Sequence, residues 1–204
     1  MPAFALRPFV FAAGSRGARS SRARPGVRAV AALALAVGLA LGAAPAFARD
    51  PGFAFELDLA EQRLRVRDAR TGEEADEIRV AVGSPAHPTP RGSFKLGRVI
   101  LRPTWTPGAA ALANGAEPED ASLGSPMGVA KIPFAEGGSI ALHGGGDPDV
   151  LGKPVSSGCV RASDADLLRL IVWLHLRGGL GPAIERADGE LHRGFARPAR
   201  LRVE

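Results

Sequence analysis

The sequence predicts a mainly β domain that contains one well-defined helix. Apolar and polar residues alternate over residues 53–59 and again over residues 63–67, as they do in the half-buried strands of a hairpin. After Ser163, apolar residues recur at helical spacing instead. Residues 50–204 are enough for one domain with a core of ordinary size, and they contain no internal repeat or coiled-coil heptad.

Residues 1–48 are typical of a secretory signal peptide. Residues 1–28 contain six arginines and no acidic residue, and residues 29–44 consist almost entirely of Ala, Leu, Val and Gly. The small-x-small pattern of a cleavage site follows and ends at Ala48. An uncleaved anchor is the alternative, but the apolar run is shorter than the roughly 20 residues of a spanning helix. We expect export by the general route, cleavage after Ala48 and a mature protein without a membrane span.

The positive charge of the chain lies in this leader. The whole sequence has 26 basic and 21 acidic residues and a formal net charge of +5. Without the six leader arginines, the chain has 20 basic and 21 acidic residues, which gives a net charge of −1. A balanced mature chain gives no electrostatic reason to expect a nucleic acid partner.

The chain between the hairpin and the cysteine predicts further strands. We expect strands at residues 77–82 and 92–101, joined by a proline-rich rigid loop, because each proline fixes φ and removes a hydrogen-bond donor. Residues 103–126 are rich in Pro, Gly, Ala and acidic residues and predict a long surface loop, a kind of segment that is often functional. Two short strands should follow at residues 128–134 and 139–143.

A helix is expected to begin at Ser163 and to end at Arg177-Gly178. Ser163 and Asp166 have the spacing of a capping box. The apolar residues at helical spacing are Leu167, Leu168, Leu170, Ile171 and Leu174. We expect a catalytic domain over residues 49–177 and a C-terminal extension over residues 178–204, which begins as a flexible segment and ends in a strand of the same domain at residues 199–203.

Cys159 is the only cysteine, and His143 precedes it by sixteen positions in a stretch rich in Gly and Pro. Such a thiol is either a small buried filler or a nucleophile to which the fold brings a histidine. A nucleophilic thiol needs a lowered pKa, which His143, Arg161 and the start of the predicted helix could each supply. Gly158 lets the backbone approach a substrate, and the amides of Gly158 and Cys159 could then form an oxyanion hole. This arrangement suits acyl transfer.

The residues around this cysteine resemble the signature of the L,D-transpeptidase catalytic domain, the YkuD family. His143-Gly144 is followed by a loop and by Ser156-Ser157-Gly158-Cys159-Val160-Arg161, where the family pattern is Ser/Thr-His-Gly-Cys-(Ile/Val)-Arg/Asn. The resemblance covers roughly residues 51–177. Further elements of the family pattern follow one another along the chain in the same order as in the family. They are Gly83, the turn Thr89-Pro90-Arg91-Gly92-x-Phe94, Pro126-Met127-Gly128 and an acidic helix start after the cysteine.

The resemblance implies a β-sandwich-like fold with a helix near the active-site cleft. It implies that Cys159 is the nucleophile and His143 the general base, and that Gly158 and Cys159 donate to the oxyanion in a loop that includes Ser157. Arg161 would hold the loop or contact a substrate carboxylate, and Gly144 and Ser156 would also line the substrate site. No metal or organic cofactor is implied.

The resemblance also implies the reaction and its compartment. Family members act in the periplasm or cell wall on peptidoglycan stem peptides. They attack the tetrapeptide at the diaminopimelate–D-Ala bond, form a thioester and pass the acyl group to an amine of another stem, a lipoprotein or a D-amino acid. Carbapenem β-lactams are expected to acylate the same thiol.

One residue departs from the family pattern, because Ser157 occupies the position before Gly-Cys where the family usually has His. His143 still occupies the position of the base, so the departure concerns the shape of the oxyanion hole and the pKa of the thiol. Two alternatives stay open from the sequence: the same site with water as acceptor, which makes a carboxypeptidase or endopeptidase, and a catalytically silent wall-binding domain.

Overall fold

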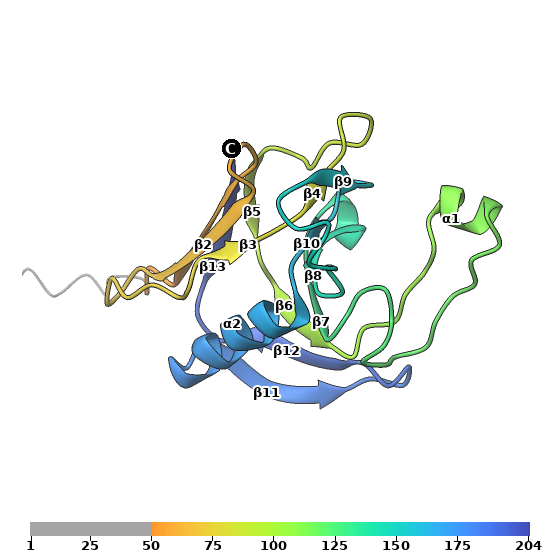
Figure 1. Cartoon of the computed structure of the whole chain (residues 1–204). Coiled ribbons are helices and arrows are strands. Elements are labelled where there is room, and N and C mark those ends of the chain that lie inside the picture. Colours follow the sequence, from red (N-terminus) through yellow and green to blue (C-terminus); the bar gives the residue numbers. More distant parts are fainter. Residues whose placement is uncertain (1–49) are drawn as a thin grey trace, which may run out of the picture. The chain divides into compact units, whose positions relative to one another are not determined.

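A computed structural model describes residues 50–204, and the predicted signal peptide and its cleavage site lie outside these residues. The described part contains a five-stranded sheet, a six-stranded sheet and a two-stranded sheet, together with one long helix (Figure 1). The domain is therefore mainly β, as predicted. None of the helices within residues 50–204 is long and apolar enough to span a membrane.

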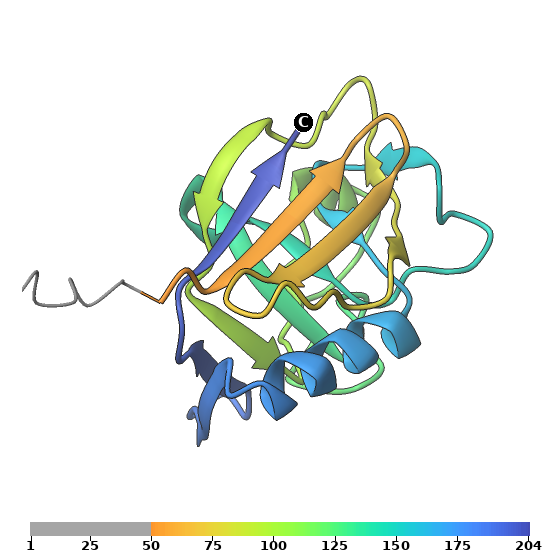
Figure 2. The same cartoon turned by 90° about the vertical axis from the view of Figure 1, so that its left-hand side faces the viewer.

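The five-stranded sheet is built around the predicted hairpin. β1 and β2 pair antiparallel with Phe53 opposite Asp68, and their buried and exposed residues alternate as the sequence indicated. The last strand, β13, lies between β1 and β5 and runs parallel to β1. Figure 2 shows this sheet with the long helix beside it. In spatial order its strands are β3 (Ile78–Arg79), β2 (Arg63–Asp68), β1 (Phe53–Asp58), β13 (Ala199–Val203) and β5 (Gly92–Lys95).

The six-stranded sheet carries the predicted histidine. β8 is buried along its whole length, as expected for a strand that is covered on both faces, and it ends at His143. Two further short strands, β4 (Val82–Gly83) and β9 (Pro154–Ser156), pair parallel with each other. In spatial order the six strands are β10 (Val160–Arg161), β8 (Ile140–His143), β7 (Ala130–Ala135), β6 (Arg98–Leu101), β12 (Leu191–Phe195) and β11 (Leu180–Glu185).

The predicted helix is confirmed as α2 (Asp164–Leu176). The Ser163 hydroxyl caps it by accepting a hydrogen bond from the backbone N–H of Asp166, at 3.1 Å. Its buried residues join side chains of both large sheets in one core, but Leu168 is 48% exposed and does not belong to that face. The buried residues of the helix are Leu167, Leu170, Ile171 and Leu174.

The structure corrects three predicted segments. Residues 92–101 form two strands instead of one, because the chain passes at Leu96-Gly97 from β5 in one sheet to β6 in the other. The segment predicted as flexible contains β11 and β12. Gly181 and Pro182 interrupt the alternation of apolar and polar residues in β11, so the sequence did not indicate a strand there. β11 tolerates both residues because it is an edge strand and pairs on one side only. The expected strand at residues 77–82 is likewise divided between β3 and the start of β4.

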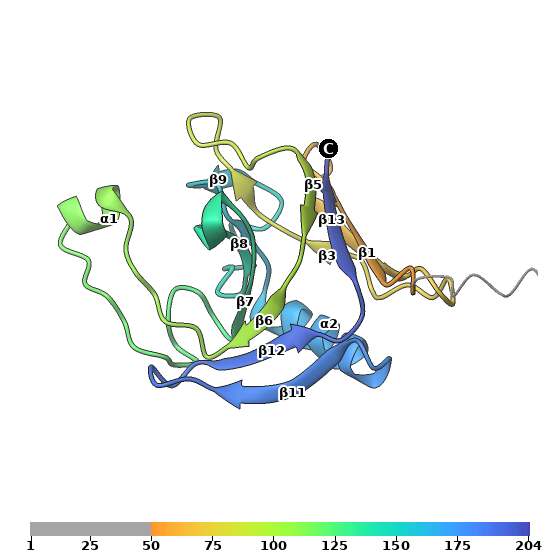
Figure 3. The ribbon, with the colours of Figure 1, turned by 180° about the vertical axis from the view of Figure 1, so that it is seen from behind.

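Residues 103–126 form the predicted long loop, which contains the short helix α1 (Ala109–Ala113). Figure 1 and Figure 3 show α1 standing away from both large sheets. The base of the loop is closed, since the Ser125 hydroxyl donates to the Pro103 carbonyl at 3.2 Å and Trp105 pairs with Glu119.

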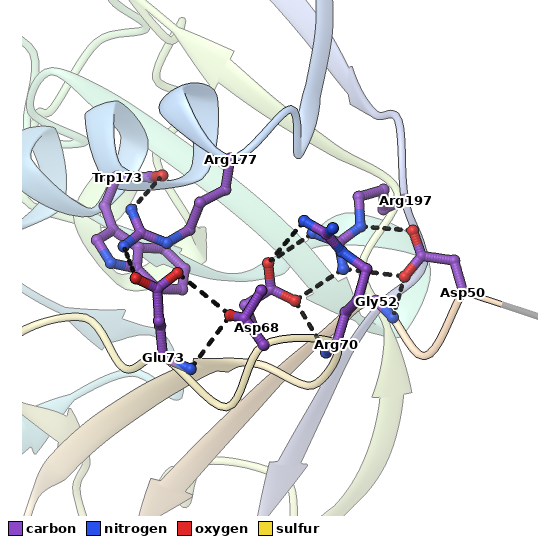
Figure 4. A network of polar contacts seen from close by, with 9 residues as sticks. Asp50, Gly52, Asp68, Arg70, Glu73, Trp173, Arg177 and Arg197 are labelled. Carbon is purple, nitrogen blue, oxygen red and sulfur yellow. Dashed lines mark hydrogen bonds and ion pairs between the residues drawn. The ribbon is translucent and has the colours of Figure 1, made fainter.

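Arg197, whose side chain is only 10% exposed, ties the start of β1 to the start of β13 (Figure 4). Arg197 donates two hydrogen bonds of 2.7 Å to the buried carboxylate of Asp68, and its guanidinium also pairs with Asp50. Its carbon Cζ lies 4.4 Å from the centre of the Phe53 ring. Hydrogen bonds from Arg197 hold the pKa of Asp68 well below its usual range despite burial, so the carboxylate is ionised when it is paired.

Candidate active site

His143 ends strand β8, and Cys159 immediately precedes the neighbouring strand β10. β8 and β10 are parallel, with Val160 opposite Leu142 and Arg161 opposite His143. Cys159 immediately precedes β10 and is partly exposed, and its thiol donates to the carbonyl of Ser139 at 3.7 Å. A histidine and a cysteine sixteen positions apart are thus placed at one edge of the six-stranded sheet.

His143 is held in one orientation and is neutral at neutral pH. The side chain is only 4% exposed, and its Nδ1 lies 2.7 Å from the carbonyl oxygen of Gly144. Because a carbonyl can only accept, Nδ1 carries the hydrogen and Nε2 carries the lone pair. Burial lowers the pKa of His143 to about 4, and the positive charge of Arg161 acts in the same direction. The ring is therefore a base that can accept a proton at Nε2.

The side chain of Ser156 stabilises the cysteine loop. The buried Ser156 hydroxyl donates to the carbonyl of Cys159 and accepts from the backbone N–H of Gly158 at 3.1 Å. The Ser156 hydroxyl is thus bonded to the backbone of the cysteine loop, and the predicted contact of Ser156 with substrate stays a prediction. Of the two amides predicted to face an oxyanion, that of Gly158 is thus already engaged. Ser157 lies exposed on the loop beside the cysteine.

Asp164 joins the histidine strand to the helix. One of its oxygens, Oδ1, accepts from the backbone N–H groups of Val129 and Gly145, each at 2.9 Å. A side chain at Gly144 would place its Cβ 2.1 Å from that same oxygen, so only glycine fits beside the carboxylate. The carbonyl of Gly144 accepts from the His143 ring, and its missing side chain leaves room for Asp164. Its predicted contact with substrate stays a prediction.

The family model of the L,D-transpeptidase catalytic domain, YkuD, matches residues 53–181. The chain belongs to the YkuD family.

The chain also shows a partial likeness to solved structures of low sequence identity. An L,D-transpeptidase from Mycobacterium smegmatis is 18% identical with a TM-score of 0.45, over 74% of this chain and 58% of that one. L,D-transpeptidase 3 from Mycobacterium tuberculosis is 15% identical with a TM-score of 0.46, over 75% of this chain and 61% of that one. The catalytic domain of the E. faecium L,D-transpeptidase is 18% identical with a TM-score of 0.47, over 74% and 95%. The chain thus spans about three-fifths of the two mycobacterial proteins. No curated protein sequence matches it.

In this YkuD domain Arg161 has a charge that the described residues do not neutralise. Its Nε is buried without a hydrogen-bond partner, and its guanidinium forms no ion pair within residues 50–204. The β8–β10 register sets Arg161 directly opposite His143, and residues paired across a sheet lie on the same face. A cation in this position can bind an anionic group beside the base.

A second polar group, missed by the sequence analysis, lies next to His143 in the YkuD sheet. Lys131 on β7 is opposite His143, and its ammonium donates to Glu190 at 2.9 Å and to the Thr104 carbonyl at 3.2 Å. Burial opposes ionisation of Glu190, but hydrogen bonds from His192, Lys131 and Thr104 lower its pKa to about 2. The ionised Glu190 therefore fixes the base of the 103–126 loop beside the site.

Sequence reasoning also missed Asp164 and Thr89 as site residues. Asp164 could have been suspected from its place in the first turn of α2, where carboxylates interact favourably with the helix dipole. Thr89 was noted only as part of a turn motif. Within residues 50–204 no group of three or more His, Cys, Asp or Glu residues is arranged to hold a metal ion.

Proposed function

We propose that the protein is a peptidoglycan L,D-transpeptidase that uses Cys159 as its nucleophile. The observation that carries the proposal is the neutral, buried His143, whose Nδ1 is anchored to a backbone carbonyl on the strand beside Cys159. Membership of the YkuD family supports the same reaction class. The predicted signal peptide supports action in the periplasm or cell wall, where the polymer lies.

In the first half-reaction Nε2 of His143 accepts the proton of the Cys159 thiol. The thiolate attacks the carbonyl carbon of the diaminopimelate–D-Ala bond in a tetrapeptide stem, and the carbonyl oxygen becomes an oxyanion. When this tetrahedral intermediate collapses, the C–N bond breaks and the His143 imidazolium gives its proton to the leaving D-Ala amine. A thioester is left on Cys159.

In the second half-reaction an amine attacks the thioester and His143 accepts the amine's proton. The new amide forms as the C–S bond breaks, and the proton returns to the sulfur. An amine from another stem gives a 3→3 cross-link, and an amine from a lipoprotein attaches that protein to the wall. Arg161 lies beside the base, its Nε has no hydrogen-bond partner among residues 50–204, and we propose that it binds a carboxylate of the stem peptide.

Water as acceptor gives the rival activity, an L,D-carboxypeptidase or endopeptidase with the same two residues. A silent wall-binding domain is the rival from another class. The anchored, neutral histidine favours an enzyme, because a binding module does not need a base in a defined tautomer.

Intact-mass spectrometry decides among these activities. The purified mature protein is incubated with a disaccharide-tetrapeptide and a D-amino acid. Loss of D-Ala with gain of the amino acid is expected. Loss of D-Ala with gain of water alone makes the protein a carboxypeptidase. An unchanged muropeptide, together with no adduct from a carbapenem, supports the silent domain.

A further inference from the structure

Thr89 is a buried hydroxyl that joins two loops of the site. Its Oγ1 accepts from the backbone N–H of Gly83 at 2.8 Å and donates to the carbonyl of Gly158 at 2.9 Å. Gly158 is 69 positions away in the sequence and directly precedes the proposed nucleophile. Thr89 is therefore the link between the turn after β4 and the cysteine loop.

The sequence around Thr89 makes this hydroxyl rigid. Pro88 and Pro90 flank it, so φ is fixed on both sides and Thr89 itself is restricted to an extended conformation. Its branched side chain has few χ1 states. The turn packs closely against Gly83, where a Cβ would lie only 2.3 Å from the carbonyl oxygen of His87. The hydroxyl thus has a defined position before substrate binds.

The peptide group that Thr89 holds would otherwise be free to turn. Gly158 has a φ of 110°. Glycine adopts positive and negative φ about equally well, so the peptide group that follows it can rotate more easily than at other residues. Ser156 fixes the N–H of Gly158 and the carbonyl of Cys159. The peptide between these two groups consists of the Gly158 carbonyl and the Cys159 N–H, and the Thr89 hydroxyl donates to this carbonyl.

We propose that Thr89 is a positioning residue that sets the direction of the Cys159 N–H toward the oxyanion. In a planar trans peptide the C=O and the N–H point in opposite directions. A hydroxyl that fixes the Gly158 carbonyl on one side therefore directs the Cys159 N–H to the other. This inference rests on the proposed acyl transfer, since only a reaction with a tetrahedral oxyanion needs that N–H.

Two reactions of the same thiol separate this role from a purely structural one. Acylation by a carbapenem opens the β-lactam C–N bond and passes through an oxyanion. Alkylation by iodoacetamide displaces iodide at a saturated carbon and forms no oxyanion. Loss of the Thr89 hydroxyl should slow acylation by about 100-fold, as a misplacement of a catalytic group by about 1 Å does, and leave alkylation at the wild-type rate.

The test compares Thr89→Val, which keeps the shape and removes the hydroxyl, with Thr89→Ser, which keeps the hydroxyl and should restore acylation. Thr71→Val is the matched control, because it removes an exposed threonine hydroxyl that contacts only Glu73. If Thr89→Val does not fold, as judged by tryptophan fluorescence, Thr89→Ala replaces it.

Equal losses of acylation and alkylation, or no loss of either, would overturn the role of Thr89. The role of Thr89 would also be overturned if Thr89→Ser were acylated as slowly as Thr89→Val. Failure of the wild-type protein to be acylated at all, with alkylation intact, contradicts the proposed acyl transfer instead. The two ideas are therefore tested separately.

Discussion

At the scale of single residues, the site depends on a histidine whose charge is suppressed by its surroundings. Burial and the neighbouring Arg161 both oppose protonation of His143, while its Nδ1 is committed to the Gly144 carbonyl. An exposed histidine would be partly protonated near neutral pH and could rotate. The sequence named both partners of the proposed catalytic pair, but the tautomer follows from a backbone carbonyl that no pattern reveals.

Cys159→Ala should abolish turnover and leave the fold intact, because the partly exposed thiol fills little of the core. His143→Ala should lower the rate by about 10²- to 10⁴-fold, as expected for loss of a general base. Turnover is measured as release of D-Ala from a tetrapeptide substrate, and folding by circular dichroism. Wild-type-like turnover by purified Cys159→Ala protein would exclude the cysteine mechanism.

Acylation should lose rate as the pH falls through about 4, the pKa of His143. Above that pH the ring is neutral and accepts the thiol proton, and below it the ring is already protonated. An ordinary histidine would impose this limit near pH 6.5. The measurement is the rate of carbapenem adduct formation between pH 3 and pH 8. Arg161→Gln removes one cause of the lowered pKa of His143, so the pH at which acylation loses rate should rise. A loss of rate near pH 6.5 in the wild-type protein would contradict the lowered pKa of His143.

At the scale of elements, the start of α2 organises the strands that carry the site. Asp164 reaches from the first turn of the helix to two backbone amides, one before β7 and one after β8. The sequence predicted the helix and its cap correctly, because capping chemistry and helical spacing are local. It did not predict this contact, because Val129 is 35 positions from Asp164 and only the packed sheet brings them together.

Asp164→Ala should destabilise the domain by about 1–3 kcal/mol for each of the two amides it leaves unpaired. It should also slow acylation, because Gly145 and Gly144 follow His143 directly. Urea unfolding monitored by tryptophan fluorescence gives the free energy of unfolding. Asp166→Ala is the control, since it removes the same charge from the same helix turn but contacts Ser163 and Arg169 instead. Equal effects of the two variants would mean that helix charge, not the loop contact, matters.

At the scale of the whole domain, the first and last strands of the described chain pair with each other, and an arginine links the segments that precede them. β13 lies between β1 and β5, and Arg197 binds Asp50 and Asp68 just before β13 begins. Removing one partner of a buried ion pair leaves a charge without compensation, which is far more costly than losing an exposed pair.

Arg197→Ala should lower the free energy of unfolding by about 3–5 kcal/mol at neutral pH. Arg63→Ala, which breaks an exposed pair with Glu77, should cost less than about 1 kcal/mol. The pairing with Arg197 lowers the pKa of both Asp50 and Asp68. Their contribution is therefore present above the ordinary aspartate pKa of about 4 and is lost as the pH falls below it. Urea unfolding at pH 7 and pH 3 checks this, and the variant should show the smaller pH dependence.

The sequence by itself determined the features that local chemistry specifies. Strand alternation gave β1 and β2, capping and apolar spacing gave α2, and one motif gave the family and the residues Cys159 and His143. The tertiary structure decided what depends on contacts distant in the chain: the division of residues 92–101 between two sheets, the pairing of β11 and β12, and the contacts of Thr89 and Asp164. Local patterns report propensity and burial, whereas a hydrogen bond between residues 69 positions apart exists only after both sheets have packed.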